Sequence, residues 1–359
     1  MLARAAGAAL TMALAAFAGL SCGGPSSQEA PPNPDLQGGP VSEAAARRVA
    51  EEAATGLRGR SPEVEKAFVE KGVALLAHRD AAARAAAAED LGQLGRRAAA
   101  GLLLRALADP KPTVRAAAAA ALGAVGDSSA AEALAECLKD PSPMVRAASA
   151  GALGAIGGRE STGLVATSQP ADGAGGPPAS ARSGAIAALL KDPDASVRRE
   201  AAKALGLLRD ANAVDPLGRA ATGDSDIQTR TAAAAALGRI AALARVAATE
   251  TPPDANACIT YLVQSLSDDA PLVRHAAAGA LGAIGDRRAT SALIARLKDR
   301  HPAVRAAAAF ALGRIADPAS AAALQDSIRT DPDESVREAA QEALRGIRPQ
   351  GAGHPAEGS

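Results

Sequence analysis

One phrase recurs along the chain at a nearly constant interval, and this repetition restricts the possible folds more than any other feature. The segment DPKPTVR (109–115) leads into AAAAAALGAVGD, and DPSPMVR (140–146) leads into AASAGALGAIGG. Five of the seven intervals between the phrase arginines are 31 or 32 residues, and the other two contain about 21 and 13 more. A period of this length predicts stacked units that contact only their neighbours. The eight arginines are Arg84 in a degenerate first copy, then Arg115, Arg146, Arg198, Arg230, Arg274, Arg305 and Arg337.

Each part of the phrase predicts one part of a helix pair. A first helix carries apolar residues such as Leu293, Ile294 and Leu297, and Asp-Pro then ends it, because proline lacks an N–H and disfavours helix in the residue before it. A second helix begins near the phrase valine and carries an apolar stripe at 3.6-residue spacing. A glycine near its end costs about 1 kcal/mol relative to alanine, so we expect a neighbouring backbone to approach closely there. These glycines are Gly92, Gly123, Gly154, Gly206, Gly238, Gly282 and Gly313.

The composition favours a stack of closely spaced helices. Apolar residues make up 48% of the chain but aromatic residues only 1%, so the core must be built from Ala, Leu, Val and Ile. No single helix pair could bury its stripe, and terminal repeats need polar faces. We therefore expect a capping helix at residues 42–57, with Ser42 as its N-cap. The last copy has polar residues where others have Ala or Gly, namely Glu338, Gln341, Glu342 and Arg345.

The pattern D-P-x-x-x-V-R-x-A-A-x-A-L-G-x-I-G resembles the HEAT repeat, specifically its phycobilisome-lyase-like subclass, over about residues 63–347. The resemblance implies an all-α fold, an α-solenoid that winds as a right-handed superhelix of about eight HEAT-type helix pairs. It also implies a ladder between adjacent repeats. In this ladder Asp109, Asp140, Asp192, Asp268, Asp299 and Asp331 would pair with Arg115, Arg146, Arg198, Arg274, Arg305 and Arg337. The fifth copy keeps Asp224 and Arg230 but has Ser225 and Thr229 for Pro and Val, so we expect it to be looser.

The first 22 residues have the features of an export signal. A basic start precedes about sixteen apolar residues, too few for a membrane span but typical of a signal peptide. The segment ends GLSC (19–22), which resembles a bacterial lipobox, and lipidation of Cys22 would place the protein on the periplasmic side of the outer membrane. Cleavage after Ala18 is the alternative, and it would leave a soluble periplasmic protein. Residues 23–41 are rich in Pro, Gly and Ser, which predicts a disordered tether.

Residues 42–348 form the predicted repeat array, and two insertions interrupt it. The first lies at about 159–182 and the second at about 247–256, and Gly, Pro, Ser and Ala dominate the first. Insertions in repeat proteins map to one face of the array and can bind ligands, whereas this composition also fits flexible spacers. The sequence leaves both interpretations open. Residues 349–359 show no periodicity, so we expect a disordered tail.

The sequence contains no recognisable catalytic constellation. None of the four histidines (His78, His275, His301 and His354) is followed by Glu, which argues against the two-iron site of deoxyhypusine-hydroxylase-like proteins. No G-x-S-x-G, Walker A or metal-spaced His/Cys pattern occurs, and Cys137 and Cys258 fall in different repeats. We therefore expect no catalytic residues, metal or cofactor. An enzyme or enzyme subunit related to HEAT-type lyases or hydroxylases is the alternative.

Charge narrows the class of partner. The 39 basic residues are balanced by 39 acidic ones, whereas a nucleic-acid binder normally has a basic excess. We expect a protein partner, no nucleic acid, and membrane contact only through the N-terminal anchor. The predicted function is a monomeric, non-catalytic scaffold or adaptor of the bacterial cell envelope, and a purely structural spacer remains an open alternative.

The second helices line the concave face of an α-solenoid, and we expect the partner to bind there. Positions off the buried stripe are mostly Ala and Gly, so few residues could select a partner. The exceptions are Arg199, Lys203, Arg239, His275, Phe310 and Arg314. Phe310 and Arg314 form the first candidate pair because aromatic residues and arginine are frequent in binding hot spots. The alternatives are that Phe310 packs into the neighbouring repeat and that the polar residues are ordinary solvated surface.

Overall fold

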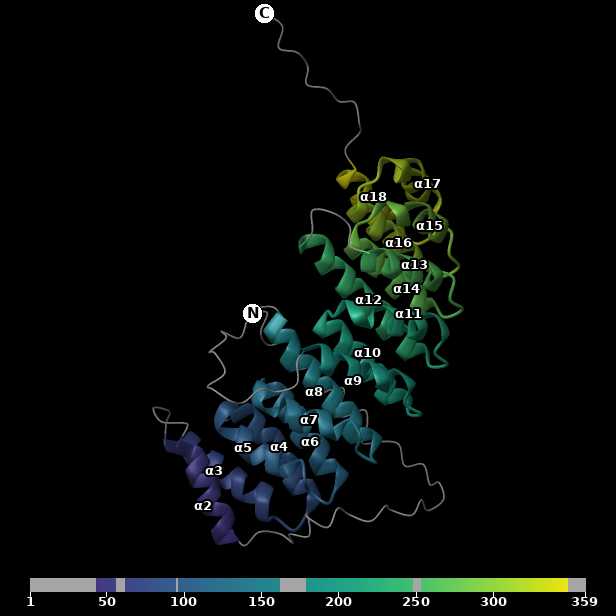
Figure 1. Cartoon of the computed structure of the whole chain (residues 1–359). Coiled ribbons are helices and arrows are strands. Elements are labelled where there is room, and N and C mark those ends of the chain that lie inside the picture. Colours follow the sequence, from purple (N-terminus) through teal and green to yellow (C-terminus); the bar gives the residue numbers. More distant parts are fainter. Residues whose placement is uncertain (1–42, 56–61, 95, 162–178, 248–252, 348–359) are drawn as a thin grey trace, which may run out of the picture. The chain divides into compact units, whose positions relative to one another are not determined.

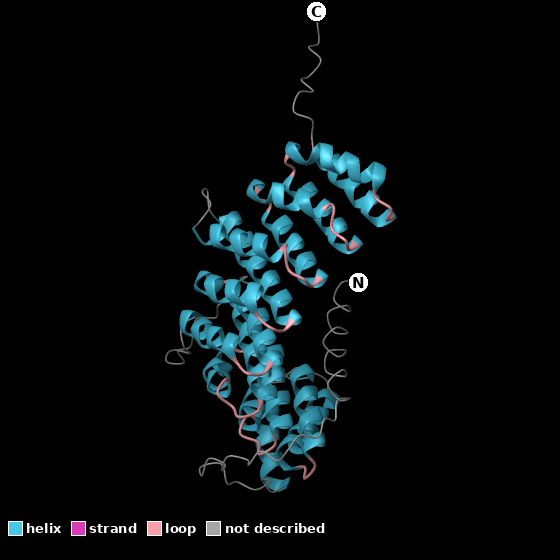
Figure 2. Cartoon of the chain, turned by 90° about the vertical axis from the view of Figure 1, so that its right-hand side faces the viewer, coloured by secondary structure: helices cyan, strands magenta, loops and turns pink. Residues whose placement is uncertain are grey.

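The structure, a computed structural model, describes residues 43–55, 62–94, 96–161, 179–247 and 253–347. Within these ranges the chain forms helices joined by short turns, with no strand (Figure 2). The predicted signal segment (1–22) with Cys22, the tether (23–41) and the tail (349–359) lie outside the described residues. Ser42 and the middle parts of both insertions also lie outside them.

Helix α2 (Glu43–Ala54) is followed by eight helix pairs, the number that the recurring phrase predicts. The first helices of the pairs are α3 (Pro62–Ala77), α5 (Arg96–Ala106), α7 (Ala131–Cys137), α9 (Ala179–Ala188), α11 (Val214–Gly223), α13 (Pro253–Ser265), α15 (Thr290–Arg296) and α17 (Ala321–Thr330). The second helices are α4 (Ala81–Leu94), α6 (Pro112–Val125), α8 (Pro143–Ser161), α10 (Ala195–Leu208), α12 (Ile227–Ala247), α14 (Pro271–Ile284), α16 (Pro302–Ile315) and α18 (Glu334–Gly346).

The second helices pack on one another in chain order, from α4 on α6 to α16 on α18 (Figure 1). Each first helix packs on the second helix of its own pair. At the N-terminal end α2 packs on α3 and α5, where Ala46 and Ala50 are fully buried. This repeated arrangement is an α-solenoid, so the predicted fold class is confirmed.

Local sequence signals set the ends of the second helices. Helices α6, α14 and α16 each have a proline in their first turn, where the missing N–H has no intrahelical partner to lose. Helices α6 and α14 end at Gly126 (φ 75°) and Gly285 (φ 69°) in the left-handed region, which glycine adopts without strain. Arg209 (φ 57°) and Ala316 (φ 53°) adopt the same conformation after α10 and α16, at a cost of about 1–2 kcal/mol each because their Cβ crowds the backbone.

The recurring glycine of the second helices marks the contact between neighbouring repeats, as predicted. A Cβ added to Gly154 would lie 2.6 Å from the Ala204 Cα, and one added to Gly282 would lie 2.7 Å from the Ala311 Cα. At the other five glycines, an added Cβ would lie 2.6–2.9 Å from the nearest atom of an alanine in the next second helix. Gly against Ala therefore sets the spacing of the stack, which explains how a core with so few aromatic residues is filled.

The two insertions are shorter than the sequence suggests because helices continue into them. Helix α8 extends to Ser161 and α9 begins at Ala179, so residues 159–161 and 179–182 are helical. Helix α12 extends to Ala247 and α13 begins at Pro253. Both insertions therefore leave the array at the C-terminal end of a second helix. Beyond Ile240, the equivalent of Ile284 at the end of α14, the extra turns of α12 have no counterpart in α14.

Candidate functional site

The phrase arginines and aspartates form a ladder that joins each repeat to the next. Seven arginines each bind the aspartate carboxylate of the following repeat through two parallel hydrogen bonds, with Nε–Oδ2 distances of 2.7–2.8 Å and Nη2–Oδ1 distances of 2.8–3.0 Å. The pairs are Arg84–Asp109, Arg115–Asp140, Arg146–Asp192, Arg198–Asp224, Arg230–Asp268, Arg274–Asp299 and Arg305–Asp331.

Each ladder arginine also binds the turn of its own repeat. The Arg115 Nη1 donates to the Asp109 carbonyl oxygen at 2.8 Å, and the Asp109 carboxylate accepts from the Lys111 backbone N–H, also at 2.8 Å. Each aspartate thus offers its carboxylate to the preceding repeat and its carbonyl oxygen to its own arginine. At the end of the ladder, Arg337 binds the Asp331 carbonyl oxygen; within the described ranges no carboxylate follows it.

The fifth copy is no looser than the others. The Arg230 Nε lies 2.7 Å from Asp268 and the Arg198 Nε lies 2.8 Å from Asp224. Thr229, which replaces the phrase valine, is buried and donates its hydroxyl to Asp226 at 2.9 Å. The expected loosening does not occur because the threonine is satisfied within its own turn.

The ladder keeps its carboxylates ionised although they are largely shielded from water. Burial opposes ionisation of Asp299, but hydrogen bonds from Arg274 and from the His301 backbone N–H outweigh it, so the pKa of Asp299 is lowered. The same balance lowers the pKa of Asp192, Asp224 and Asp268. These residues are engaged with one another, and their arrangement stabilises the stack instead of presenting charge to a partner.

The exposed surface of the second helices, here called the second-helix surface, carries the six candidate residues. Phe310 exposes 56% of its surface, and Arg314 is exposed one helical turn later in α16. Phe310 is therefore not part of the buried core. The equivalent position in α14 is Gly279, and a Cβ added there would meet nothing within 4 Å. The phenylalanine thus stands on a surface whose adjacent position carries no side chain.

The remaining candidates differ in how far they are already engaged. Lys203 forms a 2.6 Å ion pair with Glu200 on its own helix. The His275 Nδ1 lies 3.1 Å from the Ala303 carbonyl oxygen at the start of α16, so this histidine bridges two repeats. Arg199 is half-buried, whereas Arg239 is exposed. Phe310, Arg314 and Arg239 are thus the candidates most available to a partner.

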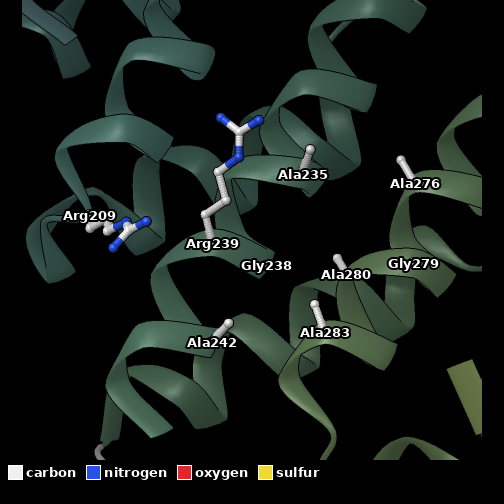
Figure 3. Close-up of a pocket in the computed structure, with 9 residues that line it drawn as sticks. All are labelled: Arg209, Ala235, Gly238, Arg239, Ala242, Ala276, Gly279, Ala280 and Ala283. Atoms are coloured by element: carbon white, nitrogen blue, oxygen red, sulfur yellow. The ribbon is translucent and has the colours of Figure 1, made fainter. Parts of the chain in front are cut away.

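A shallow hollow of about 520 Å³ lies on the second-helix surface and extends from α12 to α14. Arg209 and Arg239 line it together with seven alanines and glycines (Figure 3). Sequence reasoning found Arg239 but missed Arg209 and the hollow itself. The signal that could have revealed Arg209 is its position, since Gly126 and Gly285 occupy the equivalent place in other repeats. Two guanidinium groups above a small apolar floor could hold an anion, but the lining has no group for acid–base chemistry.

The described residues include neither a metal-binding cluster nor a membrane-spanning helix. No three or more His, Cys, Asp or Glu side chains among them gather in a way that could hold a metal ion. None of their helices combines the length and the apolar character that crossing a membrane requires.

Stacked helix pairs joined by an Arg–Asp ladder define an α-solenoid repeat protein, and comparison with family models identifies the family. The model described as HEAT repeats matches residues 69–154, 183–251 and 259–345, and the model of the HEAT-like repeat matches residues 227–284. These matches cover more than half of the chain, which therefore belongs to the HEAT-repeat family. No curated protein matches the sequence.

Solved structures of low sequence identity share the fold. YibA of Escherichia coli matches 85% of this chain and 97% of its own, with 18% identity and a TM-score of 0.50. Kap95p, solved with RanGDP, matches 86% of this chain with 16% identity and a TM-score of 0.52, and this chain spans 45% of its length. The CpcE–CpcF complex of phycocyanin lyase from Nostoc sp. matches 90% of this chain and 100% of its own, with 19% identity and a TM-score of 0.40. Identities this low indicate a common fold alone, and the lyase likeness carries no argument.

Proposed function

We propose that this chain is a non-catalytic scaffold of the bacterial cell envelope that binds a partner protein through its second-helix surface. The repeat architecture supports the proposal because stacked second helices offer an extended surface for a partner. Kap95, which has a similar fold, was solved bound to RanGDP and to Nup1. The ladder supports it further, because the charges that hold the stack together are already paired, so residues outside the ladder are left to select a partner.

Phe310 is the observation that carries the proposal. A phenylalanine with 56% exposure is a costly feature in a chain that has three phenylalanines. Full burial of such a side chain contributes about 1.5–3 kcal/mol, so roughly half of that remains to be gained on binding. Arg314 lies four residues later and therefore on the same side of α16. An aromatic ring beside a guanidinium group is typical of a binding hot spot.

The direct test is capture of the partner from envelope extract by the purified chain, followed by identification of the captured protein. The variant Phe310→Ala/Arg314→Ala should lose the partner that the unchanged chain captures. The matched control is Arg105→Ala, which removes an exposed arginine from the first helix α5, outside the second-helix surface. Equal capture by the Phe310→Ala/Arg314→Ala variant and the unchanged chain would contradict the proposed surface, as would equal loss in the control.

The location in the envelope forms part of the proposal and rests on the N-terminal sequence. Lipidation of Cys22 would leave residues 23–41 as a tether of about 25 Å between the membrane and the array. Cells fed a labelled fatty-acid analogue should label the unchanged chain but not the Cys22→Ser variant. Label in that variant would refute lipidation at Cys22, and an unlabelled chain cleaved after Ala18 would favour a soluble periplasmic protein.

A further inference from the structure

The hollow between α12 and α14 has two chemically distinct sides. Arg209 and Arg239 project from one side, and the alanines of α14 form the other (Figure 3). The floor is open as well as apolar, because a Cβ added to Gly279 would meet no atom within 4 Å. A chain of small side chains could therefore approach the backbone of α14 closely inside a hollow that both arginines line.

These two arginines differ from the ladder arginines in having no ion-pair partner among the residues that the structure describes. Every ladder arginine from Arg84 to Arg305 is held by a carboxylate, whereas neither Arg209 nor Arg239 forms an ion pair or side-chain hydrogen bond with any described residue. The lining of the hollow contains no acidic residue. The Arg239 Cδ lies 3.7 Å from the position of a Cβ on Gly206, so the aliphatic part of Arg239 rests on α10. Among the described residues no carboxylate offsets these two charges, so the hollow combines positive charge with an apolar floor.

The backbone at Arg209 carries strain that a substitution can relieve, as it also does at Ala316 after α16. Arg209 adopts φ 57°, a conformation that glycine provides at Gly126 and Gly285. Replacement by glycine would relieve the strain and would also remove one of the two charges from the hollow.

We infer that the hollow binds an acidic segment of the partner protein, whose carboxylates pair with Arg209 and Arg239 while its small side chains lie on the floor. The inference deepens the proposed function and rests on it, since the hollow belongs to the same second-helix surface as Phe310. Guanidinium groups bind carboxylates through two parallel hydrogen bonds. A nucleic acid fits the site less well, because it needs a row of phosphate contacts and stacking on aromatic side chains, and the lining has two cations and no ring.

The test measures binding of a fluorescent peptide of alternating glutamate and alanine to the full chain by anisotropy. The variant is Arg209→Gly/Arg239→Gln, which relieves strain at the first position and keeps most of the aliphatic stem at the second, so the fold is preserved. Its affinity for the peptide should fall by at least about tenfold, as expected for the loss of two charge-assisted contacts. The control Arg105→Gln removes an exposed charge from α5 and should leave the affinity unchanged. A peptide with glutamine in place of glutamate should bind weakly to all three proteins.

Three results would overturn the inference. The first is unchanged affinity in Arg209→Gly/Arg239→Gln, and the second is no measurable binding of the glutamate peptide to the unchanged chain. The third is a short oligothymidine that binds more tightly than the peptide and shows the same loss, because this would identify a nucleic-acid site. Partner capture separates this inference from the proposed function. Capture that needs Phe310 and Arg314 but not the hollow arginines refutes the inference alone, and peptide binding at the hollow without any effect of Phe310 and Arg314 on capture refutes the proposed surface alone.

Discussion

Removal of one ladder carboxylate should destabilise the chain far more than removal of an exposed one. Asp299 and Arg274 form the most deeply buried pair, with side chains 4% and 5% exposed. The change Asp299→Ala leaves the Arg274 guanidinium without its carboxylate and also removes the acceptor of the His301 backbone N–H. Loss of one partner from a buried pair costs about 3–5 kcal/mol, and the lost cap contributes about 1 kcal/mol within that range. We expect the free energy of unfolding to fall by about 4 kcal/mol.

Urea unfolding followed by circular dichroism would measure this change, and amide hydrogen exchange would locate it. Because stability in a repeat array depends on interfaces between neighbours, exchange should accelerate first in repeats seven and eight (α15–α18). The matched control is Glu342→Ala, which breaks the exposed Glu342–Arg345 pair (69% and 74% exposed) and should cost less than about 0.5 kcal/mol.

A double variant distinguishes a stranded charge from a lost contact. In Arg274→Met/Asp299→Ala no charge stays buried, so this protein should be more stable than Asp299→Ala alone, since replacing both partners is often nearly neutral. A loss below about 1 kcal/mol for Asp299→Ala, similar to that of the Glu342→Ala control, would refute the reasoning. Such a result would mean that the ladder behaves like an ordinary surface ion pair.

Three further predictions concern packing and pH. The change Gly282→Ala should destabilise the chain by about 1–2 kcal/mol, because its Cβ would lie 2.7 Å from the Ala311 Cα. The change Gly279→Ala on the same helix should instead stabilise the chain by up to about 1 kcal/mol. Thermal unfolding that ranks the two variants in the opposite order would contradict this. The Ser149→Ala variant should raise the urea midpoint by the equivalent of about 1 kcal/mol, because the Cys137 thiol is a weak hydrogen-bond partner and the buried Ser149 hydroxyl has no stronger one among the described residues. A lowered midpoint would contradict this. Because the pKa of the ladder aspartates is lowered, their contribution to stability is present above the ordinary carboxyl pKa of about 3.9 and is lost as pH falls through the lowered values. The free energy of unfolding should therefore decrease as the pH is lowered below about 4. A free energy of unfolding that stays constant in that range would contradict this.

The fold could be predicted from the sequence because every repeat carries the same local signals. Proline in the first turn, leucine on the buried stripe and glycine against alanine each act within one repeat or between direct neighbours. Eight copies in phase turn weak individual preferences into a strong joint constraint. The ladder followed from the resemblance, but its register required the structure, because each carboxylate binds the arginine of the preceding repeat.

The second-helix surface was harder to predict because its features depend on interruptions of the pattern. The continuation of α12 past Ile240 places Ala242 beside α14, and periodicity alone does not show where such an extension stops. The pairing of Lys203 with Glu200 follows from their spacing of three residues on one helix and could have been anticipated. The contact between His275 and the Ala303 carbonyl oxygen joins different repeats, so only the relative placement of α14 and α16 reveals it.

A balance of charge over the whole chain says little about a single surface of this molecule. The ladder pairs seven arginines with seven aspartates. The charge exposed to a partner is therefore set by the residues outside the ladder. Arg209 and Arg239 belong to that remainder, and no carboxylate in the hollow offsets them. The proposed function therefore assigns stability and recognition to separate sets of residues. Substitutions in the ladder should destabilise the array, whereas substitutions at Phe310, Arg314 or the hollow should weaken partner binding and leave the fold intact.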